Sequence, residues 1–169
     1  MGIFSNEKTF DYPWEKVVTA AIQKYPNPEN DSVSGIDVVS QQVRNGQLHS
    51  ERILQTKFNV MAWASKLVGF FSPYQYSLEY SVIDPKRKIM RLNTRNLCLP
   101  NQLKVDEHLE YTPHPTDPNR TIMKQWTEVS VNLPMLSDYC ESVFLSIYQN
   151  NAMRGPKGLE WVINNLHCN

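Results

Sequence analysis

The side chains that most often carry catalysis do not form a recognisable arrangement in this sequence. The chain has no G-x-S-x-G nucleophile motif, no phosphate-binding P-loop and no dinucleotide-binding fingerprint. Its four histidines occur in unrelated contexts: His49, His108, His114 and His167. Asp106, Glu107 and His108 are consecutive, but successive side chains of a strand point to opposite faces and cannot converge as a triplet. We therefore expect no catalytic residue, no metal site, no cofactor and no enzymatic activity.

Two cations fall instead on apolar faces of predicted elements. At 3.6 residues per turn, Lys24 projects about 20° from Val17, at the border of the buried stripe of the first predicted helix. In "LHSERILQTKF", alternation along a strand places Arg52 on a face with three large apolar side chains. These three are Leu48, Leu54 and Phe58.

The last predicted helix adds an amide and a third cation to this set. Its apolar stripe consists of Leu136, Cys140, Val143 and Ile147. Continuing the phase of that stripe brings Asn151 and Arg154 onto the same side. Two helices and one strand would thus direct a cation or an amide toward the interior.

A buried charge without a partner costs several kcal/mol, so these cations require anions or water. One possibility is pairing with acidic residues such as Glu107. This residue shares a strand face with Leu103, Val105, Leu109 and Tyr111. The other possibility is a cavity with a cationic patch on apolar walls, which is what an anionic amphiphile requires. The pattern of residues leaves both possibilities open.

The elements that would position these residues begin with a strand over residues 2–11 and a helix over "DYPWEKVVTAAIQKY". Pro13 occupies a first-turn position, where its missing N–H is not needed. The apolar residues recur at helical spacing: Trp14, Val17, Val18, Ala21, Ile22 and Tyr25. Pro26 disfavours a helical conformation at Tyr25 and predicts the end of the helix there.

Strands are predicted next, over residues 33–44, 48–58, 74–82, 87–98, 103–112 and 120–132, with an Asn45-Gly46 hairpin turn between the first two. "YQYSLEYSV" alternates apolar and polar residues, as a strand with one buried face does. Short connections imply antiparallel neighbours. Residues 135–166 return to helical spacing, and Pro156 predicts a kink near Ala152 to Gly155. This order indicates an α+β fold, a sheet with helices packed on one side.

The composition limits the classes of protein that fit. The 169 residues suit one domain over 1–169, and 17 Lys plus Arg against 17 Asp plus Glu give no net field toward a polyanion. No apolar stretch reaches the roughly 18 residues of a spanning helix, and the polar start "MGIFSNEK" predicts no secretory signal. Cys98, Cys140 and Cys168 match neither a zinc pattern nor a disulfide framework, so we expect reduced thiols.

Five stretches in this order carry a family resemblance: "DYPWEKV", "KYPNP", "SVIDPKRKIM", "YTPHPTDPNRTI" and "GLEWVINNL". They resemble the PRELI/slowmo domain family of intramitochondrial phospholipid transfer proteins, and the slowmo branch more than the PRELI branch. The resemblance runs from about Met1 to Leu166. It implies a curved antiparallel sheet of about seven strands, closed by helices around a single lipid cavity, as in phosphatidylinositol transfer proteins. It also implies residence in the mitochondrial intermembrane space, as a heterodimer with a small helical twin Cys-x9-Cys protein.

The resemblance also implies roles for particular residues. The head-group site of the family corresponds to Lys24, Arg52, Asn151 and Arg154. The segment "MAWASKLVGFFSPYQY" corresponds to a lid over the cavity that contacts the membrane. Its contact residues would be Trp63, Lys66, Leu67, Val68, Phe70 and Phe71. On the residues alone, a short helix packed on the core is favoured over a lid, and the resemblance reverses this preference.

The function implied is non-catalytic transfer of an anionic phospholipid between mitochondrial membranes. Resemblance to the slowmo branch favours phosphatidylserine, with phosphatidic acid second. The cations alone leave both lipids open, because both carry a phosphate that cations would hold. Two alternatives stay open: an adaptor that binds its partner but moves no lipid, and a lipid-modifying enzyme, against which the missing catalytic motifs argue.

Overall fold

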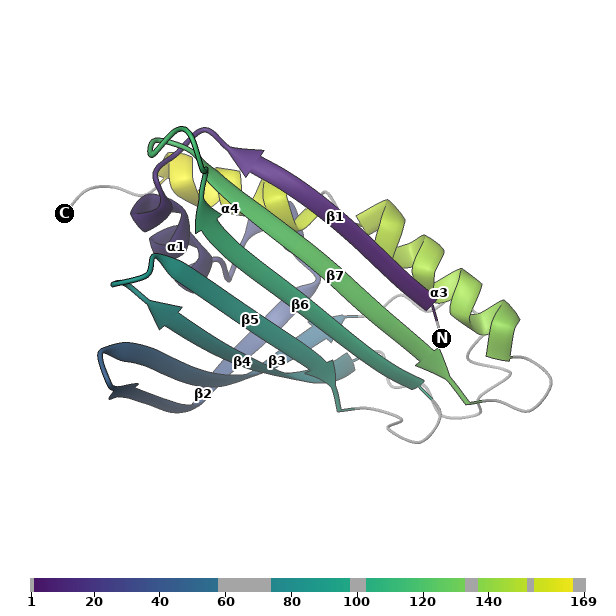
Figure 1. Ribbon diagram of the computed structural model, residues 1–169. Coiled ribbons are helices and arrows are strands. Elements are labelled where there is room, and N and C mark those ends of the chain that lie inside the picture. The colour runs from purple at the N-terminus through teal and green to yellow at the C-terminus, as the bar shows by residue number, and fades with distance from the viewer. Residues whose placement is uncertain (1, 58–73, 98–102, 133–136, 152–153, 166–169) are drawn as a thin grey trace.

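The computed structural model describes residues 2–57, 74–97, 103–132, 137–151 and 154–165 (Figure 1). In chain order the elements are β1 (Gly2–Phe10), α1 (Trp14–Ile22), the 3-10 turn η1 (Pro28–Asn30), β2 (Val33–Arg44), β3 (Gln47–Lys57), β4 (Tyr74–Asp84), β5 (Ile89–Asn96), β6 (Leu103–Pro113), β7 (Thr121–Val131), α3 (Ser137–Asn151) and α4 (Arg154–Asn165). The strand positions predicted from alternation agree with these bounds to within a few residues.

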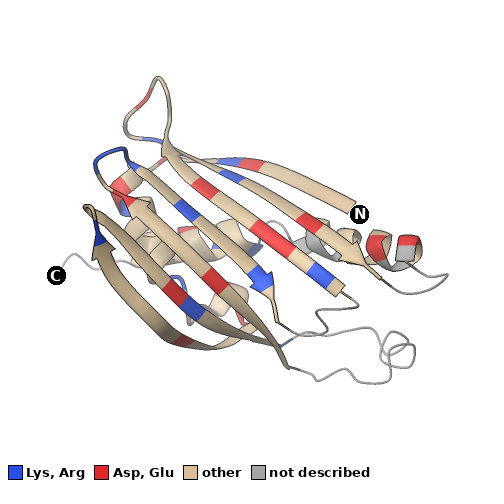
Figure 2. Cartoon of the chain, turned by 60° about the horizontal axis from the view of Figure 1, so that its bottom comes forward, with Lys and Arg blue, Asp and Glu red and all other residues tan. Residues whose placement is uncertain are grey.

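The seven strands form one curved antiparallel sheet in the order β1-β7-β6-β5-β4-β3-β2. Helices α1 and α4 pack on each other, α1 contacts β6, and α3 lies along β1 and β7 (Figure 1). The predicted α+β fold with a seven-stranded antiparallel sheet is therefore confirmed. Charged residues of both signs are interspersed along the strands, so any anion site on this neutral chain must be local (Figure 2).

The turn between β2 and β3 has the conformation that the sequence predicts. Asn45 and Gly46 have φ values of 51° and 78°, as both central residues of a type I′ turn require. The turn sets a register in which Arg44 pairs with Gln47. From there, alternation along β3 places Ser50 and Leu54 on the buried face, which is also the face of Arg52.

Helix α1 is shorter than its apolar stripe suggested. It ends at Ile22, and Gln23 closes it by donating its N–H to the carbonyl of Thr19. Lys24 therefore lies beyond the helix, and the angle obtained by continuing helical spacing from Val17 does not apply to it. The reason lies in "KYPNP": Pro26 disfavours helix at Tyr25, and the chain leaves the helix before that residue.

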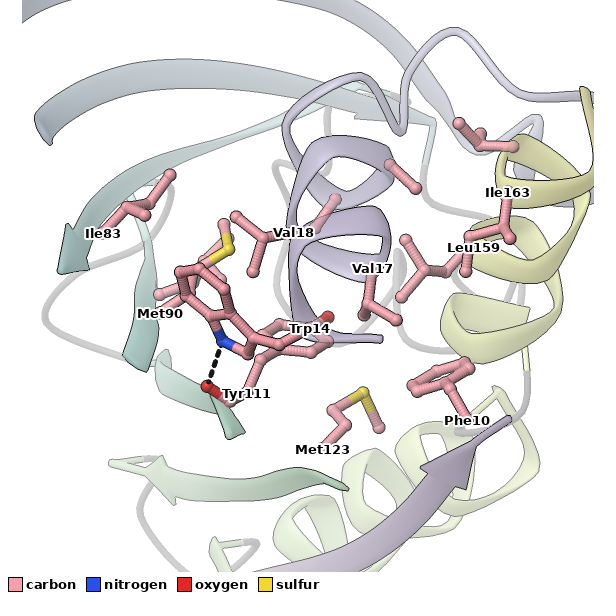
Figure 3. Packing of buried hydrophobic residues seen from close by; sticks show 14 residues of the cluster. Phe10, Trp14, Val17, Val18, Ile83, Met90, Tyr111, Met123, Leu159 and Ile163 are labelled. Atoms are coloured by element: carbon pink, nitrogen blue, oxygen red, sulfur yellow. Dashed lines mark hydrogen bonds between the residues drawn. The ribbon is translucent and has the colours of Figure 1, made fainter. Parts of the chain in front are cut away.

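The core lies between α1, α4 and the central strands (Figure 3). Its largest members come from several of these elements: Phe10, Trp14, Met90, Tyr111, Met123, Leu159 and Ile163. The indole Nε1 of Trp14 donates a 3.1 Å hydrogen bond to the backbone carbonyl of Tyr111, which fixes the start of α1 on β6. The same strand thus carries core residues and, further along, Glu107.

Hydropathy predicts that strand β4 buries its face with Tyr76 and Leu78. The structure instead buries the other face. Glu79, Ser81 and Ile83 are buried, whereas Tyr76 and Leu78 are exposed. The alternating pattern located the strand, but the apolar face of its first half lies on the outside of the sheet. The helix-facing side of the sheet is therefore polar around Glu79, which is unusual for a core and requires partners for the buried polar groups.

The helical segment predicted over 135–166 contains α3 and α4, on either side of residues 152–153. The kink predicted near Ala152 to Gly155 falls on that junction, part of which lies outside the described residues. Pro156 is the third residue of α4 and is buried, so its missing N–H falls in the first turn, where no intrahelical partner exists. Among the described helices, none has the length and apolarity needed to cross a membrane.

We expect Leu159→Ala to lower the free energy of unfolding by about 2–5 kcal/mol, because Leu159 is only 1% exposed at the contact of α4 with α1. Lys157→Ala, on the exposed side of the same helix, should change it by less than about 0.5 kcal/mol. Urea denaturation of both variants measures the difference. Equal destabilisation would contradict the packing of α4 described above.

Candidate functional site

A row of polar side chains crosses the helix-facing side of the sheet. The strand registers align Arg52 with Glu79, Glu79 with Thr94, Thr94 with Glu107, and Glu107 with Thr127. Residues that pair directly across antiparallel strands share a face, so these five side chains form one continuous row over β3 to β7. We call this set the polar row.

Arg52 and Glu79 form a buried ion pair at one end of the polar row. Their side chains are 11% and 6% exposed. The Nε of Arg52 donates to Oε1 of Glu79 at 2.8 Å, and its Nη2 donates to the same oxygen. The remaining Nη1 donates at 3.1 Å to the backbone carbonyl of Ile22, the last residue of α1. A cation at this position also complements the negative end of the helix dipole.

Lys24 lies two residues beyond that anchored end of α1 and is close to Gly155 of α4. Its Nζ is 5.2 Å from the ring centroid of Tyr25 and 3.4 Å from where a side chain on Gly155 would begin. Burial lowers the pKa of the Lys24 ammonium, but Tyr25, Tyr111 and Glu107 outweigh burial and raise it above its ordinary value. Lys24 is therefore charged at neutral pH. Burial also raises the pKa of the Tyr111 phenol to about 12, so that phenol is neutral.

Glu107 is the second carboxylate of the polar row. Its Oε1 accepts a 2.6 Å hydrogen bond from the Nε2 of Gln125. Burial raises the pKa of Glu107, and the opposing effects of Lys24 and Gln125 do not fully compensate for it. The prediction that this residue shares its face with Val105 and Tyr111, both buried, is confirmed.

The other predicted head-group residues lie at the junction of the last two helices. Arg154 is the first residue of α4, with an exposed side chain, and the adjacent Gly155 is the residue near Lys24. Asn151 is the last residue of α3, and its side chain lies outside the described part of the chain. The structure thus brings Lys24 and Arg52 together at the end of α1. The backbone of Gly155, next to Arg154, lies near Lys24 at the same end of the helix.

The predicted lid residues lie outside the described residues. They are Trp63, Lys66, Leu67, Val68, Phe70 and Phe71, all within residues 58–73. The lid stays a prediction from the sequence.

The outer face of the sheet holds the other two members of the Asp106-Glu107-His108 triplet. Asp106 forms ion pairs with Arg95 and Lys104, and His108 stacks on Trp126. The prediction that the triplet does not converge is therefore confirmed. Over the described residues, no cluster of three or more His, Cys, Asp or Glu could hold a metal ion.

Three members of the polar row escaped prediction from the sequence: Glu79, Thr94 and Thr127. Glu79 shares its strand face with Ser77 and Ser81, which alternation assigned to the polar side, and only the register with Arg52 shows that this side is the interior. Thr127 is fully buried, and its hydroxyl has no hydrogen-bond partner among the described residues. A threonine in a strand carries no signal that distinguishes such a position.

Breaking the buried pair should be costly. We expect Arg52→Met to lower the free energy of unfolding by about 3–5 kcal/mol, because Glu79 would keep a buried charge without its partner. The double variant Arg52→Met, Glu79→Leu should lose much less, since it leaves no charge behind. A double-mutant cycle by urea denaturation measures the coupling, and additive losses would contradict the pair.

Glu107→Gln should stabilise the fold at neutral pH. Because the pKa of Glu107 is raised on folding, the folded state keeps its proton where the unfolded chain has lost it, and stability falls as pH rises above about 4.3, the ordinary glutamate pKa. The glutamine variant escapes this loss. Urea denaturation across pH should show an advantage at pH 7 that disappears in acid, and a pH-independent difference would refute the raised pKa.

Solved structures share this fold. A protein from Thermus thermophilus aligns with a TM-score of 0.63 at 14% identity, covering 97% of this chain and 98% of that one. A START superfamily protein from Mycobacterium smegmatis aligns with a TM-score of 0.55 at 14% identity, covering 98% and 99% of the two chains. At these identities the likeness concerns the fold alone.

Two relatives found by sequence share a higher identity with this chain than these solved structures do. The "Protein UPS2, mitochondrial" of Saccharomyces cerevisiae is 30% identical over 168 residues, covering 96% of this chain and 73% of its own length. The "Protein slowmo homolog" of Dictyostelium discoideum is 31% identical over 163 residues, covering 95% and 71%. The model of the PRELI-like family matches residues 15–169. The chain, with its polar row inside a helix-covered antiparallel sheet, therefore belongs to the PRELI-like family.

Proposed function

We propose that this protein carries one anionic phospholipid at a time between mitochondrial membranes across the intermembrane space, without altering it chemically. Phosphatidylserine is the favoured lipid and phosphatidic acid the second. The observation that carries the proposal is the charged ammonium of Lys24, which lies beside an apolar core on the helix-facing side of the sheet. Membership of the PRELI-like family supports the same function.

An interior of this kind suits an amphiphile with a phosphate. On the side of the polar row away from the α1–α4 core, the same face of the sheet is apolar at Leu103, Val105, Val129 and Val131. At about 3.4 Å per residue, four residues along β6 separate Glu107 from Leu103 by about 13 Å. Polar and apolar surfaces therefore lie within the length of a single phospholipid.

Lys24 is the cation best suited to bind the phosphate. Within the described part of the chain, no carboxylate forms an ion pair with it, whereas Arg52 is already paired with Glu79. Arg52 holds the end of α1 in place beside the head-group site through its hydrogen bond to the Ile22 carbonyl. Arg154 and Asn151, at the junction of α3 and α4, complete the head-group site as the family resemblance implies.

Transfer requires no bond to break, so the proposed mechanism needs no nucleophile. The protein docks on a membrane, takes up a lipid and releases it on the apposed membrane. Trp63, Leu67, Val68, Phe70 and Phe71 would enter the bilayer interface, and Lys66 would meet lipid phosphates, as the sequence of that segment suggests.

The compartment and the partner belong to the same proposal. The printed name of the yeast relative places that protein in mitochondria, which supports a mitochondrial location here. The intermembrane space and a small helical twin Cys-x9-Cys partner follow from the family resemblance. Binding to the folded state alone would stabilise this chain by mass action.

Lys24→Glu tests the phosphate site. Replacing the ammonium by a carboxylate removes a charge-assisted hydrogen bond and adds repulsion, so transfer of phosphatidylserine between liposomes should fall at least about tenfold. The control is Lys86→Glu, the same change of charge in the exposed turn between β4 and β5, which should transfer normally. Circular dichroism verifies that both variants fold.

Unchanged transfer by a folded Lys24→Glu protein would remove Lys24 from the site. Recovery of lipid with a changed structure, detected by mass spectrometry, would instead show that the protein is an enzyme.

A further inference from the structure

Within the described part of the chain, the interior around the polar row holds two cations and two carboxylates. A site that binds only a phosphate would need the cations but not the carboxylates. The cations Lys24 and Arg52 face the carboxylates Glu79 and Glu107 on the same side of the sheet. A buried carboxylate is costly to keep and repels a phosphate. The ion pair with Arg52 accounts for Glu79, but not for Glu107.

Glu107 has no cationic partner at ion-pair distance among the described residues. Its hydrogen bond comes from the neutral amide of Gln125, and among the described residues no Lys, Arg or His forms an ion pair with it. Lys24 is close enough to lower the pKa of Glu107 but does not reach ion-pair distance. A half-buried carboxylate in this situation is stabilised by any cation that binds beside it.

Thr127 supplies a second acceptor beside it. Its side chain is 0% exposed, and its Oγ1 has no hydrogen-bond partner in the described structure. The register pairs Thr127 directly with Glu107, which places their Cβ atoms about 4.5–5.5 Å apart. One small group between these side chains can therefore contact both.

An ammonium group matches these acceptors. It carries three donors and a positive charge, whereas a carboxylate only accepts and a threonine hydroxyl can accept. Two carbon atoms separate the phosphate oxygen from the nitrogen in the head groups of phosphatidylserine and phosphatidylethanolamine. A phosphate held at Lys24 would thus leave its amine within reach of the neighbouring Glu107.

Building on the proposed function, we infer that Glu107 and Thr127 form an ammonium subsite that selects phospholipids with an amine-bearing head group over those without one. Lys24 recognises the phosphate common to all phospholipids. The ammonium subsite distinguishes among them.

Liposome transfer with paired lipids tests the subsite. Phosphatidylcholine donor vesicles would carry either phosphatidylserine or phosphatidylglycerol, which has the same net charge, a comparable size and no amine. The unaltered full-length protein should transfer phosphatidylserine faster. Glu107→Gln, which keeps an acceptor for Gln125, should bring the ratio of the two rates down about tenfold or more, toward one, because a charge-assisted bond is lost.

Two further variants make the result specific. Thr127→Val keeps the shape and removes the unpartnered hydroxyl, so it should lower the same ratio without destabilising the fold. Glu110→Gln makes the same change as Glu107→Gln on the outer face of β6, where Glu110 pairs with Arg91, and should leave the ratio unchanged. Thermal denaturation of each variant establishes that the folded protein is compared.

The outcomes separate the two proposals. Transfer of neither lipid by the unaltered protein would overturn the proposed function and the subsite with it. Transfer with the same lipid ratio in Glu107→Gln as in the unaltered protein would overturn the subsite alone, as would an equal loss of both lipids.

Discussion

The buried pair of Arg52 and Glu79 is the interaction on which the arrangement of the site depends. It joins β3 to β4, and through the carbonyl of Ile22 it also holds the end of α1. That contact positions the end of α1 over β3 and β4, and Lys24 lies two residues beyond it. The pair therefore acts together with the Trp14 hydrogen bond to Tyr111 in fixing α1, and with it Lys24, over the sheet that carries Glu107.

The strands and the site differ in how much of them the sequence predicts. Alternation located the strands, and the parity of side chains placed Arg52 and Glu107 on the interior face. These are local properties of a chain in extended conformation. Lys24 was directed inward by a helical phase that does not reach it, because α1 ends at Ile22. Its surroundings come from Tyr111 and Gly155, which no local pattern connects to it.

Strand β4 shows why hydropathy misleads in a protein of this kind. A face with Glu79 and Ser81 is ordinarily assigned to water, yet both are buried. Inside the sheet, Arg52 rather than water partners Glu79, so the usual equation of apolar with inside fails around the polar row. The signal that could have found Glu79 is its register with Arg52, a pairing between strands that a single sequence does not display.

Tyr111 belongs to the core and to the site at once. Its backbone carbonyl accepts a hydrogen bond from the indole of Trp14, while its phenol lies near the ammonium of Lys24. A substitution that shifts Trp14 against β6 would therefore also move the phenol that lies near the Lys24 ammonium. Changes confined to the packed core can thus alter the surroundings of this cation without replacing any residue of the polar row.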